Sequence, residues 1–386
     1  MDEKQILFSL IRAELGGAVI DTALTDSITA DMLEELYSLS DKHDLSHIVG
    51  SALSKINLQI EGDILQKFQK DTFSAVYRYQ KLNYELSAVT KTLEGAQIPF
   101  MPLKGSVLRK YYPKPWLRTS CDVDVLVREE DLDRAVRVLV NSLKYRSEGK
   151  GSHDISLFSQ SGMHIELHYK LVEDGLADSI TKLLSLAWDM AVLKEGSSYH
   201  YEMPDGMFYF YHVAHMSKHF ENGGCGIRPF IDLWILDNID CADNEKREEL
   251  LRCGGLLQFA EVSRKLSRVW LDGEEYDSLT EKMQSYILFG GVYGNAENRI
   301  VVQQQKKGGK IKYALSKIFI PLETIKLQYP ILEKHPYLMP IMQVRRWFKL
   351  IFCGHAKRSI RELSYSNNIS KAKSEEIKNF LLEIGL

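Results

Sequence analysis

The sequence predicts an α+β protein in which a small mixed β-sheet is embedded in a largely helical chain. Apolar residues recur at intervals of three and four in the first 94 residues and again after residue 190, which is typical of helices. Between these regions, residues 122–127 and 163–169 alternate polar and apolar types, as strands with one buried face do. We therefore expect an N-terminal helical region (1–94), an α/β core (95–190) and a C-terminal helical region (191–386).

Composition narrows the class of protein. The 386 residues are 45% hydrophobic and 26% charged, which argues against a disordered or fibrous chain. The five cysteines are odd in number and form no C-x-x-C pair, which argues against a disulfide framework and a cysteine zinc site. No run of 18 apolar residues and no cleavable leader pattern is present. We expect a cytoplasmic protein without a membrane span.

The spacing of apolar residues and the positions of prolines predict the elements before the first long strand. The last helical pattern of the N-terminal region ends near Leu93. Residues 97–102 contain two prolines and cannot continue that helix, so they are predicted to be extended. A short helix over 107–112 then follows Lys104-Gly105-Ser106.

The alternating segments and the helix between them form the expected core. Residues 122–127 place three valines on one sheet face and Asp122 and Asp124 on the other. Residues 131–143 return to helical spacing, with Asp131 or Glu130 near the N-cap. Strands are predicted at 155–158 and 163–169, and the second of these carries Glu166. The prediction is a β-α-β-β segment between helical neighbours.

These residues suggest a phosphate and metal site. A glycine followed by serine at a strand-to-helix turn allows a phosphate to approach backbone N–H groups, so Gly105 and Ser106 are candidates. Asp122 and Asp124 with Glu166 form a set of hard oxygen ligands that favours Mg²⁺, with Mn²⁺ as the second choice. Three converging carboxylates would repel one another without a cation between them.

The chain resembles the nucleotidyltransferase-fold superfamily, and within it a family of uncharacterised bacterial nucleotidyltransferases. The resemblance rests on three motifs, namely Leu-Lys-Gly-Ser at 103–106, the run from an arginine to Asp-x-Asp-x-Leu-Val at 118–127, and His-Ile-Glu-Leu-His at 164–168. It extends through His215, His219 and residues 228–232 to the stretches at 329–332 and 338–345. Residues 95–190 would then be the nucleotidyltransferase core.

The resemblance implies an enzyme that moves a nucleoside monophosphate from an NTP, ATP included, to an acceptor and releases pyrophosphate. Asp122, Asp124 and Glu166 would be the catalytic and metal-binding residues. The nucleotide would contact Lys104, Gly105, Ser106 and Arg118, although Lys104 could equally be a solvated turn residue and Arg118 could instead hold the Asp strand through a salt bridge. The acceptor is not readable, and small molecules, RNA and protein all stay open.

We expect a second group of residues near the site, and each of them has two possible roles. His164 and His168 flank Glu166 and either orient it or are ordinary strand histidines. His212, His215 and His219 share a helix face, which suits either a metal set or polar packing near the site. Arg228 and Asp232, four residues apart, are read as an intrahelical ion pair, with a nucleotide contact by Arg228 as the alternative.

The basic segment 301–361 is the remaining feature. It holds 13 Lys and Arg against 2 acids, a local +11 in a chain of net charge −3, so the rest sums to −14. The partner could be RNA, an acidic protein or an anionic membrane, or the segment could be a solvated face. We also expect Arg345 or Arg346 to face Asp122 and Asp124 across the cleft, where they would help to hold a triphosphate.

Two functional hypotheses follow. The first is the Mg²⁺-dependent transferase. The alternative is a non-catalytic nucleotide- or RNA-binding scaffold that uses the basic C-terminal helices, and the presence of all three acids argues against it.

Overall fold

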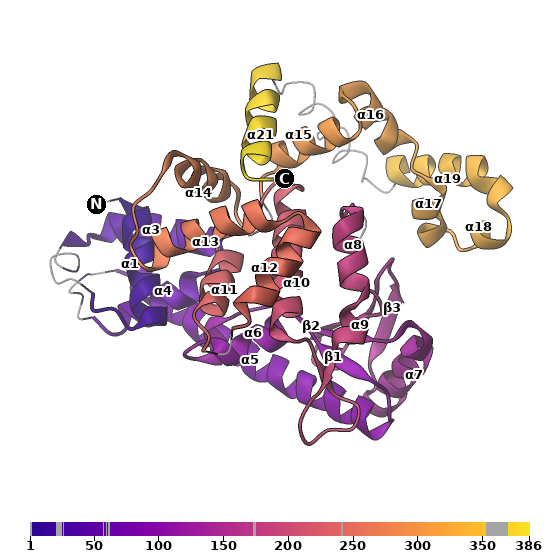
Figure 1. Ribbon diagram of the computed structural model, residues 1–386, viewed down its shortest axis with the longest axis horizontal. Helices are drawn as coiled ribbons and strands as arrows, with labels where there is room; N and C mark the ends of the chain where they lie inside the picture. Colours follow the sequence, from indigo (N-terminus) through magenta and orange to yellow (C-terminus); the bar gives the residue numbers. More distant parts are fainter. Residues whose placement is uncertain are drawn as a thin grey trace.

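Helices make up most of the chain and surround one five-stranded mixed sheet, which confirms the predicted α+β class (Figure 1). The computed structural model describes residues 2–352 and 370–386, apart from 21–24, 26, 57, 59, 61, 173, 174, 241 and 293. Two of the cysteines, Cys241 and Cys353, and the end of the basic segment at 353–361 lie outside the described residues.

The N-terminal region is helical, as its apolar spacing predicts. Its helices are α1 (Glu3–Gly16), α3 (Ala30–Lys42), α4 (Ser46–Leu53) and α5 (Ile64–Gly95). Asp2 caps α1 in a capping box with Gln5, and the Thr29 side chain caps α3. The long helix α5 runs beneath the sheet in Figure 1 and ends just before the first strand.

The sheet has the strand order β1-β2-β5-β4-β3. Its strands are β1 (Phe100–Pro102), β2 (Asp122–Val127), β3 (Arg146–Lys150), β4 (Asp154–Phe158) and β5 (His164–His168). The described elements between β1 and β3 are α6 (Gly105–Leu108), η1 (Arg109–Tyr111), η2 (Pro115–Leu117), η3 (Glu129–Asp131) and α7 (Leu132–Leu143). Strands β2 and β5 pair in parallel, whereas the other pairs are antiparallel.

One detail of the predicted core needs correction. Strand β3 was not predicted, because all five of its residues are exposed at the sheet edge and show no alternation. Asp131 does occupy the N-cap of α7, but its side chain makes no capping hydrogen bond.

The two faces of the sheet have different partners. The valines at 123, 125 and 127 are buried in one hydrophobic cluster with Leu82, Val89 and Leu93 of α5 and with Leu132 and Leu139 of α7. Because side chains alternate along a strand, the acids of β2 and β5 project from the opposite face. The sequence pattern therefore directs the acidic side chains of β2 and β5 away from α5 and α7.

The C-terminal region begins after the sheet. Its elements up to the last shared core helix are α8 (Asp178–Ser185), α9 (Ala187–Met190), β6 (Val192–Leu193), β7 (Tyr201–Glu202), α10 (Asp205–Phe220), α11 (Arg228–Asp237), α12 (Asn244–Gly254), α13 (Leu257–Leu271), α14 (Ser278–Gly290) and α15 (Ala296–Lys306). Helices α10 to α15 share one hydrophobic core with α1, α3 and α4, so the two flanking helical regions pack together.

The chain then leaves this core. The following elements are α16 (Lys310–Ile318), α17 (Leu322–Gln328), α18 (Ile331–Lys334), η4 (Pro336–Leu338) and α19 (Met339–Phe352), and α21 (Lys371–Glu383) returns to the core through Ile377, Phe380 and Leu381. Figure 1 shows α16 to α19 extending as an arm away from the sheet. Within the described part of the chain, no helix is both long enough and apolar enough to cross a membrane.

Candidate functional site

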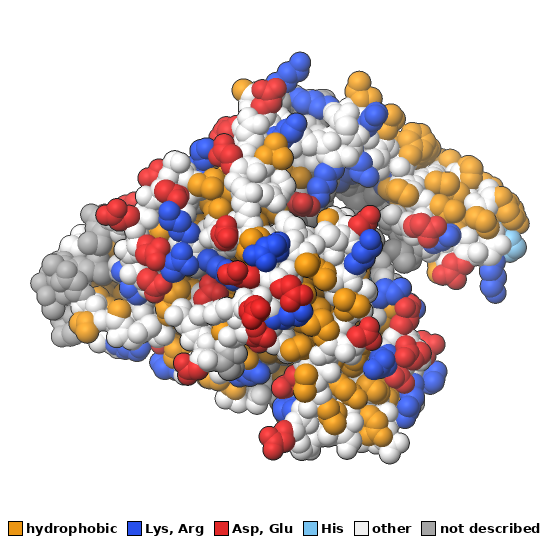
Figure 2. Space-filling view, in the orientation of Figure 1, with side chains coloured by type: hydrophobic (Ala, Val, Ile, Leu, Met, Phe, Trp, Pro, Cys, Tyr) orange, Lys and Arg blue, Asp and Glu red, His pale blue; other side chains and the backbone are white. Residues whose placement is uncertain are grey.

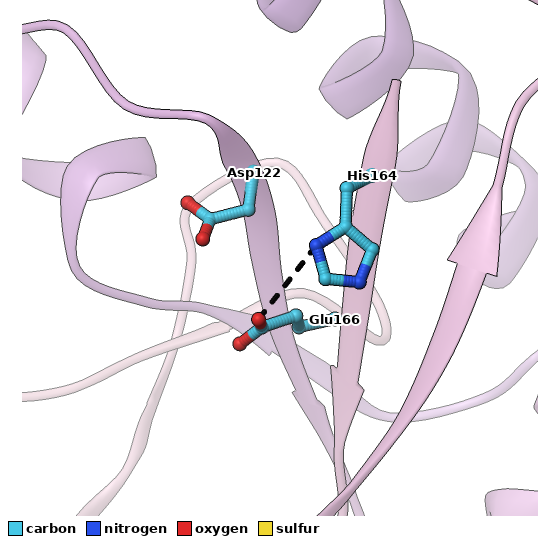
Figure 3. Close-up of side chains that lie close together, drawn as sticks. All are labelled: Asp122, His164 and Glu166. Carbon is cyan, nitrogen blue, oxygen red and sulfur yellow. Dashed lines mark ion pairs between the residues drawn. The ribbon is translucent and has the colours of Figure 1, made fainter. Parts of the chain in front are cut away.

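Glu166 lies close to each of the two aspartates because β2 and β5 are parallel neighbours in a fixed register. Asp124 lies opposite Glu166, and Asp122 lies opposite His164. Ligand atoms of Asp122, His164 and Glu166 lie within 4.8 Å of one another, and so do those of Asp124, Glu166 and His168. Figure 3 shows the Asp122, His164 and Glu166 side chains turned toward the same space from the two strands. Glu166 is common to both groups.

Asp124 is the buried centre of the cluster, with only 2% of its surface exposed. Its Oδ1 accepts hydrogen bonds from Lys104 Nζ at 2.9 Å and from His168 Nε2 at 2.9 Å. Burial alone would raise the pKa of the Asp124 carboxyl, but Lys104 and His168 outweigh burial and hold that pKa well below its usual range. Asp124 is therefore an ionised carboxylate at neutral pH.

Lys104 owes its position to an unusual backbone. It has φ 44°, in the left-handed region, immediately before α6. Burial opposes its charge, but the neighbouring Asp124 outweighs burial and raises the Lys104 pKa above its ordinary value. A fixed positive charge thus lies among the three acids.

Asp122 has the opposite electrostatic balance. Burial, followed by repulsion from Asp124 and Glu166, raises the pKa of Asp122 to about 6. A positive ion beside Asp122 would relieve this repulsion, which is the behaviour expected of a cation ligand.

The two histidines on β5 hold the acids. His168 is buried, and its Nε2 also lies 3.3 Å from Glu166 Oε2. His164 Nδ1 lies 3.7 Å from Glu166 Oε1, the contact dashed in Figure 3. The interpretation that these histidines orient Glu166 agrees with this geometry, whereas an ordinary half-exposed strand histidine does not describe His168.

Helix α10 contributes a row of rings near the acids. His215 lies 6.4 Å from Tyr211 and 4.4 Å from His219, measured between ring centroids. Burial, with His219 and Lys104 as lesser causes, lowers the pKa of His215 well below its usual value, so the imidazole is neutral. His212 instead contacts the Pro229 carbonyl at 2.9 Å. The three histidines are not among the metal-ligand groups of the described residues, which favours polar packing over a zinc site.

Gly105 and Ser106 begin α6, as expected, but no hydrogen bond in the described part of the chain joins Ser106 to the acids. Its N–H donates to the Leu103 carbonyl, and its buried hydroxyl has no partner among the described residues. Ser106 borders a cavity of about 440 Å³ whose lining also comes from α5 and the β6–β7 hairpin. None of the three acids lines that cavity.

Arg118, Arg228 and Asp232 form structural pairs that local spacing did not predict. The predicted intrahelical pair is wrong, because Asp232 Oδ1 instead accepts from Arg118 Nε at 2.7 Å and from Tyr112 at 2.7 Å. Arg228, at the start of α11, pairs with Asp44. Burial raises the pKa of Asp232, but Arg118 outweighs burial and lowers it below the usual value. Of the two interpretations of Arg118, the structure supports the salt bridge.

The expected position of Arg345 or Arg346 across the cleft is also wrong. Arg346 donates to the carbonyls of Lys317 and Ile318 at 3.0 and 3.1 Å, and so satisfies the C-terminal end of α16. Arg345 lies over the Tyr329 ring, 5.8 Å from its centroid. Figure 1 shows their helix, α19, well apart from β2.

Two residues near the site were missed from the sequence. Burial, with Asp124 and Glu166 as lesser causes, raises the pKa of Tyr211 above its usual value. Lys218 has its pKa lowered to about 8 by burial and by Lys104. Tyr211 precedes His215 by four residues and Lys218 follows it by three, so extending the histidine face of α10 would have found both.

The family comparison agrees with this arrangement. The model of a family described as uncharacterised nucleotidyltransferase matches residues 30–272, more than half of the chain. That span contains the whole sheet and helices α3 to α13. No curated protein and no solved structure matches the chain.

Proposed function

The chain belongs to the family of uncharacterised nucleotidyltransferases, and we propose that it transfers a nucleoside monophosphate from an NTP to an acceptor hydroxyl. A bond forms between the acceptor oxygen and the α-phosphorus, and the bond from that phosphorus to the α–β bridging oxygen breaks. Pyrophosphate leaves, and the acceptor proton passes to a base. Such a reaction needs positioning and charge neutralisation more than covalent chemistry from the protein.

One observation carries the proposal. Strands β2 and β5 are paired so that Glu166 lies within ligand reach of Asp122 and of Asp124 on one face of the sheet. Asp122 is placed there against an electrostatic penalty, since its pKa is raised to about 6. A fold that served only to pack its core would not gain from this arrangement.

The donor set fits a divalent cation. Asp122, Glu166 and His164 offer carboxylate oxygens and one imidazole within 4.8 Å of one another. Oxygen donors suit Mg²⁺, and a nearby imidazole makes Mn²⁺ an acceptable substitute. Bound there, the cation would neutralise triphosphate charge and lower the pKa of the acceptor hydroxyl.

Lys104 supplies positive charge from the protein itself. Its ammonium is held by Asp124 at 2.9 Å and stays protonated at neutral pH. We propose that Lys104, with the Gly105 backbone, contacts the triphosphate at this position. Ser106 and Arg118 would support the site indirectly, because Ser106 borders another cavity and Arg118 is paired with Asp232.

Glu166 is the proposed base. It is less buried than Asp124, and it is flanked by His168 at 3.3 Å and His164 at 3.7 Å. These contacts fix its carboxylate while leaving it accessible to an acceptor, so Glu166 would take the acceptor proton.

The experiment is a transfer assay with α-labelled NTPs. Label transfer to small molecules, RNA or the chain itself is followed together with pyrophosphate release, with Mg²⁺ or Mn²⁺ and with EDTA. We expect release that needs the cation and falls by at least about a hundredfold in Asp122→Asn and Glu166→Gln. Asp133→Asn, which changes an exposed acid on α7, is the matched control and keeps full activity.

The same assay distinguishes the transferase from the non-catalytic scaffold. NTP binding without pyrophosphate release, under every acceptor and cation tested, would favour the non-catalytic hypothesis. Release that persists in both Asp122→Asn and Glu166→Gln would show that the chemistry lies elsewhere.

A further inference from the structure

The arm formed by α16 to α19, residues 310–352, exposes apolar side chains on the faces of two of its helices. On α16 the exposed residues Ile311, Leu315 and Ile318 are spaced by four and three, so they share one face of the helix. Ile311 is 78% exposed. A core-facing helix would turn this face inward, whereas α16 presents it to solvent.

Helix α19 repeats the feature. Its residues Ile341, Val344 and Phe348, spaced by three and four, are all exposed, with Ile341 at 60% and Phe348 at 56%. Figure 2 shows hydrophobic side chains gathered over the part of the surface that this arm occupies in Figure 1. Two helices therefore offer apolar faces, which is more than the scattered exposed residues of an ordinary surface.

Cations border these faces. Residues 310–349 contain eight Lys and Arg against two acids, Glu323 and Glu333. Lys312 follows Ile311 directly, and Arg345 and Lys349 follow Val344 and Phe348, so positive side chains flank both stripes. Glu323 is itself paired with Lys326 at 2.8 Å.

We infer that this arm binds the surface of an anionic lipid bilayer, with the apolar stripes in the acyl–headgroup boundary and the flanking cations at the headgroups. An amphipathic helix with aliphatic and aromatic residues on one face and Lys and Arg beside them has the chemistry of an interfacial helix. Anionic headgroups complement its charge. This inference does not depend on the transfer reaction.

Other occupants fit the surface less well. Nucleic acids stack on aromatic rings, but the stripes are mainly aliphatic, as at Ile311, Leu315 and Ile341. A second copy of the arm would bring like charges together, since eight cations face only two acids. An anionic bilayer offers an apolar phase for the stripes and negative headgroups for the flanking cations.

The test is sedimentation of the full chain with vesicles of phosphatidylcholine alone or of phosphatidylcholine mixed with phosphatidylglycerol. We expect binding to the mixed vesicles that weakens with added salt. Ile341→Ser with Phe348→Ser should lower the partition coefficient at least about tenfold. Lys312→Gln with Lys349→Gln should lower it by a similar factor of about ten.

Matched controls remove exposed groups from α5. Phe73 is 72% exposed, so Phe73→Ser tests the loss of an aromatic residue elsewhere, and Lys70→Gln tests the loss of a cation. Both should bind vesicles as the unchanged chain does. An unaltered Tm in all variants shows that the fold is intact.

Three results would overturn the inference. One is an absence of binding to the mixed vesicles. Another is binding that Ile341→Ser with Phe348→Ser leaves unchanged in a folded chain. The third is binding to another partner in place of vesicles, either a dimer in solution that the apolar variant dissociates or an RNA oligonucleotide complex that the charge variant abolishes.

Discussion

Asp124 is held as an anion by two donors from different elements. Lys104 reaches it from the start of α6, and His168 reaches it along the neighbouring strand β5. A buried carboxylate without such partners would take up a proton or destabilise the fold. The pair of Lys104 and Asp124 therefore has a structural role in addition to the proposed contact with a triphosphate.

The first prediction concerns this pair. Lys104→Met removes one of the two donors to a buried charge, so we expect the free energy of unfolding to fall by about 3 kcal/mol. Adding Asp124→Asn removes the charge that was left and should recover part of the loss. Urea denaturation of the two single variants and the double variant measures the coupling. Strictly additive losses would contradict the prediction.

The second prediction uses the pKa of Asp122, which is raised to about 6 by burial and by repulsion from Asp124 and Glu166. Because an unfolded aspartate titrates near about 4, protonation of Asp122 favours the fold. That stabilisation is complete below about pH 4 and is lost as the pH rises through about 6. In EDTA we expect Asp122→Asn to raise the free energy of unfolding by about 1–2 kcal/mol at about pH 8.

Denaturation at two pH values checks this. At about pH 4 the gain from Asp122→Asn should disappear, since the native carboxyl is then largely protonated. A gain of equal size at both pH values would point to a packing effect in place of a charge effect.

At the scale of elements, the strands of the site could be predicted and one edge strand could not. Strands β2 and β5 alternate polar and apolar residues because one face of each packs in the cluster with α5 and α7 and the other carries the acids, and this period is visible in a single sequence. Strand β3 has no buried face, so its residues carry no such signal. The same alternation predicts that Asp122, Asp124 and Glu166 project from one face of the sheet.

Contacts between distant elements were beyond the reach of local spacing. Arg118 and Asp232 are 114 residues apart, and Arg228 and Asp44 are 184 residues apart. A spacing of four suggested that Arg228 and Asp232 pair on one helix. The buried Asp232 pairs instead with Arg118, which follows η2 directly. The predicted position of Arg345 and Arg346 was wrong for a related reason. The net charge of a segment does not show which part of the fold its side chains contact.

The third prediction compares these two ion pairs. Asp232→Asn leaves the buried Arg118 guanidinium without its anion, so we expect a loss of about 3 kcal/mol in the free energy of unfolding. Arg228→Met breaks a pair whose Asp44 side chain is 37% exposed and should cost about 1 kcal/mol or less. Denaturant titration of both variants gives the comparison. Equal losses would contradict the assignment of Arg118 as a structural residue.

At the scale of the whole molecule, the site lies where two hydrophobic cores meet. The sheet, α5 and α7 form one core, and α10 belongs to the other, which also contains α1 and the helices up to α15. Lys104 and the acids of the sheet shift the pKa values of Tyr211 and His215 on α10. Ligand binding at the acids should therefore stabilise the chain across both cores.

The fourth prediction follows from this position. At a Mg²⁺ concentration about a hundredfold above its Kd, binding adds about 2.7 kcal/mol to the stability of the folded state. We expect Tm to rise by a few degrees, measured by differential scanning calorimetry against NaCl of equal ionic strength. Glu166→Gln should remove most of the rise, while Asp133→Asn should leave it unchanged.

The most direct test of the central claim is calorimetric titration of a non-hydrolysable NTP into the chain with Mg²⁺ or with EDTA. The claim is that Asp122 and Glu166, with His164, hold a cation that binds the triphosphate together with Lys104, which Asp124 keeps in place. It predicts binding that weakens at least about tenfold in EDTA and by a similar factor in Glu166→Gln with Mg²⁺ present. Equal affinity with Mg²⁺ and with EDTA, or an affinity that Glu166→Gln leaves unchanged, would contradict it.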